Sequence, residues 1–208
     1  MAIADRKERE RKQREQTILS AAEDIFLSKG YDHSTMEDIA QKAELSKGTL
    51  YLYFQNKNEL CMAITINCLK VLQNKINNIF QQKINGIQKF LLLPKVYQDF
   101  QKNHSRYFKG LLTHQFHRYD CPNDGKIFQK WLAENNKINQ SIVCILEEGI
   151  SDGSIKPNID KHKMAVLIWG EQNGILLSSL FSEAKHRTGE LMDYFFLLLA
   201  QAIGTRSF

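Results

Sequence analysis

The segment formed by residues 46–57 carries side chains that suit contact with the phosphates and bases of nucleic acid. It contains two lysines and no acidic residue, and several of its other residues bear hydroxyl groups. Lysine neutralises phosphate charge, and hydroxyl groups donate hydrogen bonds to phosphate oxygens. Gly48 has no side chain, so a phosphate or a base edge can approach the backbone closely there. This composition indicates a nucleic-acid contact surface.

A second group of residues has the chemistry of metal ligands. His114, His117, Asp120 and Cys121 lie in one short stretch, and the two histidines are spaced to share a helix face. Histidines near the end of a helix are more commonly surface residues. We therefore expect no metal site, and zinc binding is the alternative.

The remaining reactive residues form no recognisable catalytic group. No nucleophile, base and orienting residue occur together, and the sequence has no phosphate-binding loop. The four cysteines form no CxxC pair. We interpret Cys61 and Cys68 as buried free thiols, with redox sensing as the alternative. The sequence therefore predicts neither an enzyme nor a bound cofactor.

The overall charge does not locate a nucleic-acid site. The chain of 208 residues has a formal net charge of +5, yet residues 1–60 contain 10 Lys and Arg against 11 Asp and Glu. The basic excess lies in residues 61–208. Nucleic-acid binding must therefore depend on where individual charges lie rather than on their sum.

The N-terminal region is predicted to be an arm followed by a helix. Residues 1–16 are a mixed-charge run with a local excess of cations, which we expect to be frayed. Such an arm is either solvated surface or a contact to phosphates or a minor groove. From Thr17, apolar residues recur at spacings of three and four, which indicates a helix, and Gly30 stops it.

Capping residues predict a short second helix over residues 36–43. Thr35 is a good N-cap with Asp38 at the capping-box position, and Ser34 with Glu37 is an equally acceptable pair. The unpaired backbone amides at such a helix start also favour phosphate oxygens.

A third helix follows at once over residues 47–53, with Ser46 as its cap and with Leu50 and Phe54 facing inward. Two short helices joined by a tight turn form a helix-turn-helix, here residues 35–54. One such helix fits a major groove about 12 Å wide. The outer face of this helix offers Ser46, Lys47, Thr49 and Tyr51.

The rest of the chain is also predicted to be helical, with a connecting helix over residues 57–82. Further helices are expected over residues 87–102, 104–118, 124–151, 160–182 and 188–203. The sequence thus indicates an all-α protein. The charged N-terminus and the lack of a long apolar run predict a cytoplasmic location with no membrane contact.

Residues 35–60, which read TMEDIAQKAELSKGTLYLYFQNKNEL, closely resemble the DNA-binding signature of the TetR family. The ordered combination of Asp-Ile-Ala, Ser-x-Gly-x-Leu-Tyr-x-Tyr-Phe and Lys-x-x-Leu carries the resemblance, which extends back to Thr17. The resemblance implies double-stranded DNA as the partner. The implied phosphate contacts are Thr35, Lys47, Tyr51, Tyr53 and Lys57, and the residues nearest the bases are Lys47, Gly48 and Thr49.

Glu44 stands where the family often has glycine in the turn between the helices, and a non-glycine residue at positive φ costs roughly 1 kcal/mol. Tyr53 is divided between packing and a phosphate contact, whereas Phe54 is expected to belong to the core.

The resemblance also implies three parts: the arm of residues 1–16, a DNA-binding domain of residues 17–60, and a helical effector-binding and dimerisation domain of residues 61–208. The last two helices are expected to pair with their copies in a homodimer. The apolar residues of the final helix support this expectation. Gly170 and Gly174 either allow close approach of a helix or line a pocket.

An effector pocket is harder to place, because a run of aromatic residues is more often core than ligand site. If part of the run lines a pocket, the effector is an apolar or aromatic small molecule. The candidate residues are Tyr97, Phe100, Tyr107, Phe108, Phe116, Phe128, Trp131 and Trp169.

The predicted function is a sequence-specific DNA-binding transcription regulator, a repressor that a small-molecule ligand releases from a palindromic operator. Two identical reading heads in a dimer require such a palindrome. The alternative is an architectural or division-control protein of the same fold that binds DNA without a small-molecule effector.

Overall fold

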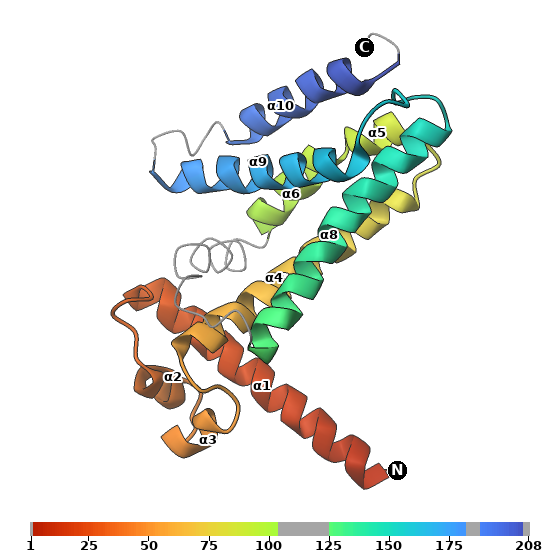
Figure 1. The fold of residues 1–208 in the computed structure, drawn as a ribbon. Coiled ribbons are helices and arrows are strands. Elements are labelled where there is room, and N and C mark those ends of the chain that lie inside the picture. The colour runs from red at the N-terminus through yellow and green to blue at the C-terminus, as the bar shows by residue number, and fades with distance from the viewer. Residues whose placement is uncertain (1, 104–124, 182–187, 206–208) are drawn as a thin grey trace. The chain divides into compact units, whose positions relative to one another are not determined.

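The structure is a computed structural model, and it describes residues 2–103, 125–181 and 188–205. Helices dominate these residues, and apart from an isolated bridge between Ile155 and Gly204 no strand occurs among them. The prediction of an all-α fold is confirmed (Figure 1). Within the same ranges, no helix is both long enough and apolar enough to cross a membrane.

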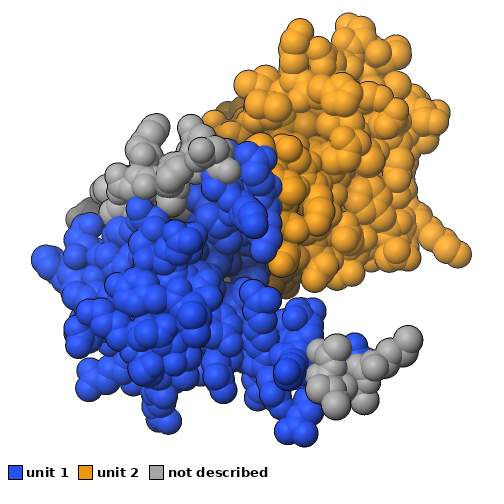
Figure 2. Space-filling view, turned by 60° about the horizontal axis from the view of Figure 1, so that its bottom comes forward, with its two compact units in different colours: residues 1–68, 106–131 blue, residues 69–105, 132–208 orange. Residues whose placement is uncertain are grey.

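The chain divides into two compact units, which Figure 2 distinguishes by colour. The first contains residues 1–68 and 106–131, and the second contains residues 69–105 and 132–208. Helices α4 (Lys57–Phe80) and α8 (Lys126–Ser151) contribute residues to both units. The domain boundary predicted after residue 60 lies inside α4 and stays a prediction.

Helix α1 (Ala2–Lys29) begins well before the predicted start, because the mixed-charge arm is part of it. The expectation that residues 1–16 are frayed is wrong for the residues of this arm that the structure describes. Oppositely charged side chains four residues apart, such as Arg6 and Glu10 at 2.7 Å, support a helix surface. Gly30, with φ of 79°, ends the helix as predicted.

In the first unit, α2 (Met36–Lys42) packs against both α1 and α3 (Lys47–Tyr51). Ile39, Leu50 and Leu60 come from α2, α3 and α4, and none of them has any exposed surface. These side chains form the core on which the two short helices rest.

In the second unit, the single helix predicted over residues 87–102 is two helices, α5 (Gly86–Phe90) and α6 (Leu93–Asn103). Pro94 explains the break. A continuous helix would need a backbone N–H at this position and would place the proline ring against the preceding turn, whereas the first turn of a new helix needs no such donor.

The last two helices, α9 (Lys161–Phe181) and α10 (Thr188–Ile203), match the predicted ranges within one residue. Helix α10 packs against α5, α6 and α9 (Figure 1). The rings of Phe90 in α5 and Phe196 in α10 lie 4.9 Å apart between centroids and have no exposed surface. This contact fixes α10 in the core of the unit.

Two glycines of this unit lie where there is no space for a side chain: Gly86, where α5 approaches α8, and Gly149, where α8 contacts Ile155. A Cβ atom added to Gly86 would lie 2.2 Å from the Cα of Gly149, and one added to Gly149 would lie 2.4 Å from Cδ1 of Ile155. Next to this contact, the buried ammonium of Lys89 pairs with Glu148 of α8. A larger side chain at Gly86 would force the two helices apart, and one at Gly149 would displace the side chain of Ile155.

Candidate nucleic-acid interface

The start of α2 is held by a complete capping box between Thr35 and Asp38. The amide of Asp38 donates to Oγ1 of Thr35 at 3.1 Å, and the amide of Thr35 donates to Oδ2 of Asp38 at 3.0 Å. The prediction that Thr35 is the N-cap is confirmed. The Lys29 ammonium, together with the hydrogen bonds from Thr35, lowers the pKa of Asp38. The carboxylate is therefore ionised at neutral pH, as a cap at the positive end of a helix requires.

Glu44 occupies the turn between α2 and α3 in the left-handed region, with φ of 56°. It is the only non-glycine residue with positive φ in the described part of the chain. Its amide donates to Gln41 O at 3.1 Å, and the amide of Leu45 donates to Ala40 O at 2.9 Å. These bonds end α2 and turn the backbone sharply into α3. The strain predicted from the departure at Glu44 is therefore present.

Ser46 caps α3, accepting a hydrogen bond from the amide of Thr49 at 3.1 Å. Leu50 is fully buried and Phe54 is 5% exposed, so both belong to the core as predicted. Helix α3 ends at Tyr51, two residues earlier than the sequence indicates, because the amides of residues 53 and 54 both return to Leu50 O. Helix α3 is therefore short, and burial of Leu50 fixes the orientation of its inner face.

The opposite face of α3 is open to solvent. Lys47 and Gly48 are exposed at its start, and Tyr51 is 44% exposed. Tyr53 is half-buried, which leaves both of its predicted roles open. Leu52 is 82% exposed, although a leucine in this position is easily taken for core. An apolar side chain on a DNA-facing surface can contact a thymine methyl group.

Glu37 places a carboxylate opposite Lys47, which the sequence reasoning did not detect. Nζ of Lys47 lies 3.4 Å from Oε2 of Glu37, and both side chains are more than half exposed. The segment 46–57 is free of acids only along the chain, because Glu37 comes from the first turn of α2. A spacing of ten residues across a turn gives no periodic signal in the sequence.

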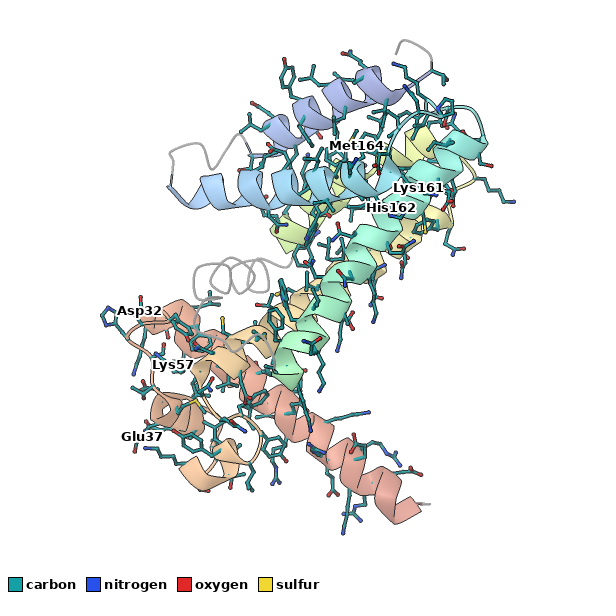
Figure 3. All side chains as sticks on the ribbon, in the orientation of Figure 1. Asp32, Glu37, Lys57, Lys161, His162 and Met164 are labelled. Atoms are coloured by element: carbon teal, nitrogen blue, oxygen red, sulfur yellow. The ribbon has the colours of Figure 1, made fainter. Side chains whose placement is uncertain are left out.

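Lys57, predicted to contact phosphate, is held by the loop that follows α1. Its Nζ donates to the backbone oxygen of Tyr31 at 2.8 Å and lies 4.7 Å from the centroid of the Tyr31 ring. The hydroxyl of Tyr31 in turn donates to Oδ1 of Asn58. Figure 3 labels Asp32 on this loop, Glu37 on α2 and Lys57 at the start of α4. Lys57 therefore links the start of α4 to the loop after α1.

The two short helices and the start of α4 enclose an open groove of about 580 Å³. Four of the predicted DNA-contacting residues line it, namely Thr35, Lys47, Tyr51 and Lys57. The other lining residues are Tyr31, Ser34, Met36, Glu37, Gln55, Asn56 and Asn58. Asn and Gln side chains there can donate to phosphate oxygens, and no sequence pattern had pointed to them.

The candidate effector residues fall into separate places. Tyr97 and Trp169 lie in the second unit with ring centroids 6.1 Å apart, and Phe100 is buried in the same unit. Phe128 and Trp131 stack at 5.7 Å in the first unit. Tyr107, Phe108 and Phe116 lie outside the described residues.

The other candidate ligands from the sequence are placed only in part. His114, His117, Asp120 and Cys121 lie outside the described residues, so zinc binding there stays an open alternative. Cys61 and Cys68 are buried, as predicted for structural thiols, and Cys144 is partly exposed.

Residues 18–64 match the profile of a family described as bacterial regulatory proteins, tetR family. Among characterised relatives, the fatty acid metabolism regulator protein of Bacillus subtilis is 23% identical over 89% of this chain and 93% of its own length. The regulator SrpR of Pseudomonas putida is 23% identical over 81% of this chain and 76% of its own length.

A solved structure of the regulator FadR from Bacillus subtilis, in complex with stearoyl-CoA, has the same fold. It superposes with a TM-score of 0.74 at 20% identity, covering 90% of this chain and 98% of the other. The profile match covers α2, α3 and the start of α4, where the groove lies. The fold similarity covers both units.

We predict that Lys47→Ala weakens binding to duplex DNA by roughly tenfold and lowers the salt dependence of binding by about one unit of slope, because one phosphate contact is lost. The complementary change, Glu37→Gln, frees Lys47 from its ion pair. It should raise affinity by about twofold to fivefold, the range expected for a surface pair. Both effects are measured by fluorescence anisotropy over a salt series.

The matched control is Lys42→Ala. Lys42 of α2 is about as exposed as Lys47 and does not line the groove. Its Nζ lies 3.8 Å from Oδ2 of Asp24 in α1. It should leave DNA affinity and salt slope close to those of the unchanged protein. Equal effects of the Lys42 and Lys47 substitutions would contradict a specific role for Lys47.

The turn gives a second prediction. Glu44→Gly should raise the free energy of unfolding by about 0.5–1 kcal/mol, because glycine adopts positive φ without strain. The greater conformational entropy of glycine in the unfolded chain offsets only part of this gain. Urea unfolding measures the change. Glu44→Ala removes the charge and keeps the Cβ atom, so it should bring no such gain. A gain as large as that of Glu44→Gly would assign the effect to charge.

Proposed function

Because the chain belongs to the tetR family of bacterial regulatory proteins, we propose that it is a repressor that binds a palindromic operator as a homodimer. The chain is a DNA-binding transcription regulator. In this proposal an apolar small molecule binds the second unit and releases the protein from DNA.

DNA binding by the first unit is supported mainly by α3, which exposes one face to solvent while its other face is held in the core. Capping by Ser46 and burial of Leu50 set the position of the helix, and the face with Lys47 and Gly48 is open. A helix presented in this way enters the major groove while α2 lies across the backbone. The capped start of α2 at Thr35 then lies where phosphate contacts form.

The exposed side of α9 supports dimerisation. Val166 and Leu167 are each 64% exposed. One and two turns further along the helix, Gly170 and Gly174 are exposed, and a Cβ atom at either would meet nothing within 4 Å. These glycines make no room for any described part of the chain itself. They suit the close approach of a helix from a second copy, the first of the two roles predicted for them.

Helix α10 carries exposed apolar side chains as well. Leu191, Tyr194, Leu197 and Leu198 are each between 43% and 62% exposed. Exposed apolar surface of this extent on two neighbouring helices is typical of an interaction site. A second copy of the same chain is the occupant we propose, since a twofold axis brings the same surface of each subunit together.

An apolar effector is supported by the aromatic residues buried in the second unit and by the relatives. Tyr97, Phe100 and Trp169 lie in that unit, and the similar FadR structure holds stearoyl-CoA. We propose that ligand binding favours a dimer in which the two α3 helices are spaced wrongly for the operator. This is a shift between two populations, so the ligand must bind the DNA-incompetent one more tightly.

The alternative function is a DNA-binding architectural or division-control protein of the same fold without an effector. Selection of bound sequences separates the two functions. A regulator selects a few promoter palindromes in the genome, whereas an architectural protein occupies many dispersed sites.

We predict that selection from random duplex DNA yields an inverted repeat. Its half-sites should be centred about 34–36 Å apart along the helix axis, or a multiple of that spacing, because each subunit presents one reading helix. Sequencing of the bound pool measures this. Enrichment of single half-sites without symmetry would contradict binding as a twofold dimer, and no enrichment at all would contradict sequence-specific recognition.

We further predict that Leu167→Glu converts the dimer into a folded monomer, because a charge would be buried in an apolar interface without a partner. Its affinity for the selected palindrome should fall by at least about tenfold, since the second half-site no longer adds to binding. Sedimentation equilibrium and anisotropy measure the two effects.

Leu132→Glu is the control for this substitution, because Leu132 is a leucine of α8 that is also exposed, at 37%. It should leave both the mass and the DNA affinity unchanged. A dimer that survives Leu167→Glu would place the interface elsewhere.

A further inference from the structure

Two buried polar side chains of the second unit have no hydrogen-bond partner among the described residues. Gln172 of α9 has no exposed surface, and neither its amide oxygen nor its amide nitrogen is bonded. The hydroxyl of Tyr97 in α6 is also unpaired, and this residue is 1% exposed. Buried polar groups in folded proteins are nearly always hydrogen-bonded, so each of these groups calls for a partner.

The two residues belong to one neighbourhood. The ring of Tyr97 lies 6.1 Å from that of Trp169, and Gln172 follows Trp169 by one turn of α9. Residues three apart on a helix share a face, so Tyr97 packs against the face of α9 that carries Gln172.

Two polar side chains close to this pair, Trp169 and Gln98, already have partners. Nε1 of Trp169 donates to Oδ1 of Asn135 at 2.9 Å. Gln98, next to Tyr97 in α6, donates to Gly189 O at 3.2 Å and to Asp193 at 2.8 Å. Close neighbours of the pair therefore satisfy their own polar groups without using Tyr97 or Gln172.

A group that pairs with these side chains must be uncharged. Burial raises the pKa of Tyr97, so its hydroxyl stays protonated and both donates and accepts. An amide likewise donates and accepts, and neither side chain balances a charge. Phe100 and Trp169, both buried, make the surroundings apolar, and an ion there would be desolvated without compensation.

We propose that Tyr97 and Gln172 form the polar end of the effector site and bind an uncharged hydroxyl or carbonyl oxygen on the buried, otherwise apolar part of the effector. The inference rests on the proposed function, in which an apolar molecule binds this unit. It adds two residues with assigned roles and a chemical class for the part of the effector that is buried.

The first test measures the stability of the ligand-free chain of 208 residues. Tyr97→Phe and Gln172→Met remove unpaired polar atoms at nearly constant volume, so each variant should melt at or above the temperature of the unchanged protein. The matched control, Asn135→Leu, leaves Nε1 of Trp169 unpaired and should lower the melting temperature by about 2–4 °C. A comparable loss in the Tyr97 and Gln172 variants would overturn the proposal, because both groups would then have partners in the folded chain.

The second test uses 1-decanol and decanoate as probes, which share an alkyl chain and differ in charge. Titration followed by tryptophan fluorescence should show tighter binding of decanol than of decanoate. Tyr97→Phe and Gln172→Met should each weaken decanol binding by about tenfold, the effect of one buried hydrogen bond. Unchanged decanol affinity in both variants, or tighter binding of decanoate, would overturn the proposal.

Failure of this inference is distinguishable from failure of the proposed function, because the titration involves no DNA. If decanol affinity is unchanged in both variants while the protein still selects a palindrome, only the effector subsite is wrong. If no sequence is selected but decanol binding depends on both side chains, the subsite stands and the DNA-binding function fails.

Discussion

Helices of seven and five residues have no stability of their own in water, and this constraint governs the DNA-binding unit. Helices α2 and α3 exist because Ile39 and Leu50 are fully buried against neighbouring elements and because Thr35 and Ser46 satisfy the first amides of each helix. The position of the exposed face of α3 therefore depends on how tightly its inner face packs against the rest of the unit. Substitutions in the core of this unit would change DNA binding without touching DNA, because they would move the reading helix.

The charged side chains around the groove of this unit contact other protein groups when no DNA is bound. Lys29 pairs with Asp38, Lys47 with Glu37, and Lys57 with backbone oxygens of the loop after α1. Each lysine thus has a protein partner, and in the proposed DNA complex the phosphates must compete for Lys47 and Lys57. Competition of this kind lowers affinity for any duplex. It favours a sequence whose additional base contacts outweigh the lost ion pairs, which is a route to specificity.

Local signals in the sequence were sufficient for most elements of the fold, and they failed where the structure depends on contacts between distant residues. The cap at Thr35 and the inward side of Leu50 could be predicted, because each depends on residues within one turn of helix. The positive φ at Glu44 was expected only because the family that the segment resembles often has glycine there. The helicity of the arm was missed because its pairs, such as Arg6 with Glu10, stabilise a helix without an apolar stripe. The pairing of Glu37 with Lys47 and the anchoring of Lys57 could not be predicted, since both require the fold.

Helix α9 connects the two proposed activities of the second unit. Its inner face carries Trp169 and Gln172, which are buried, and its outer face carries Leu167 and Gly170, which are exposed. A helix with continuous backbone hydrogen bonds moves as one body, so a ligand that pairs with Gln172 and shifts α9 also shifts the surface that a second copy would contact. In such an arrangement the effector needs no path of its own to the DNA. Its binding energy acts on the dimer geometry directly, and through that geometry on the spacing of the two α3 helices.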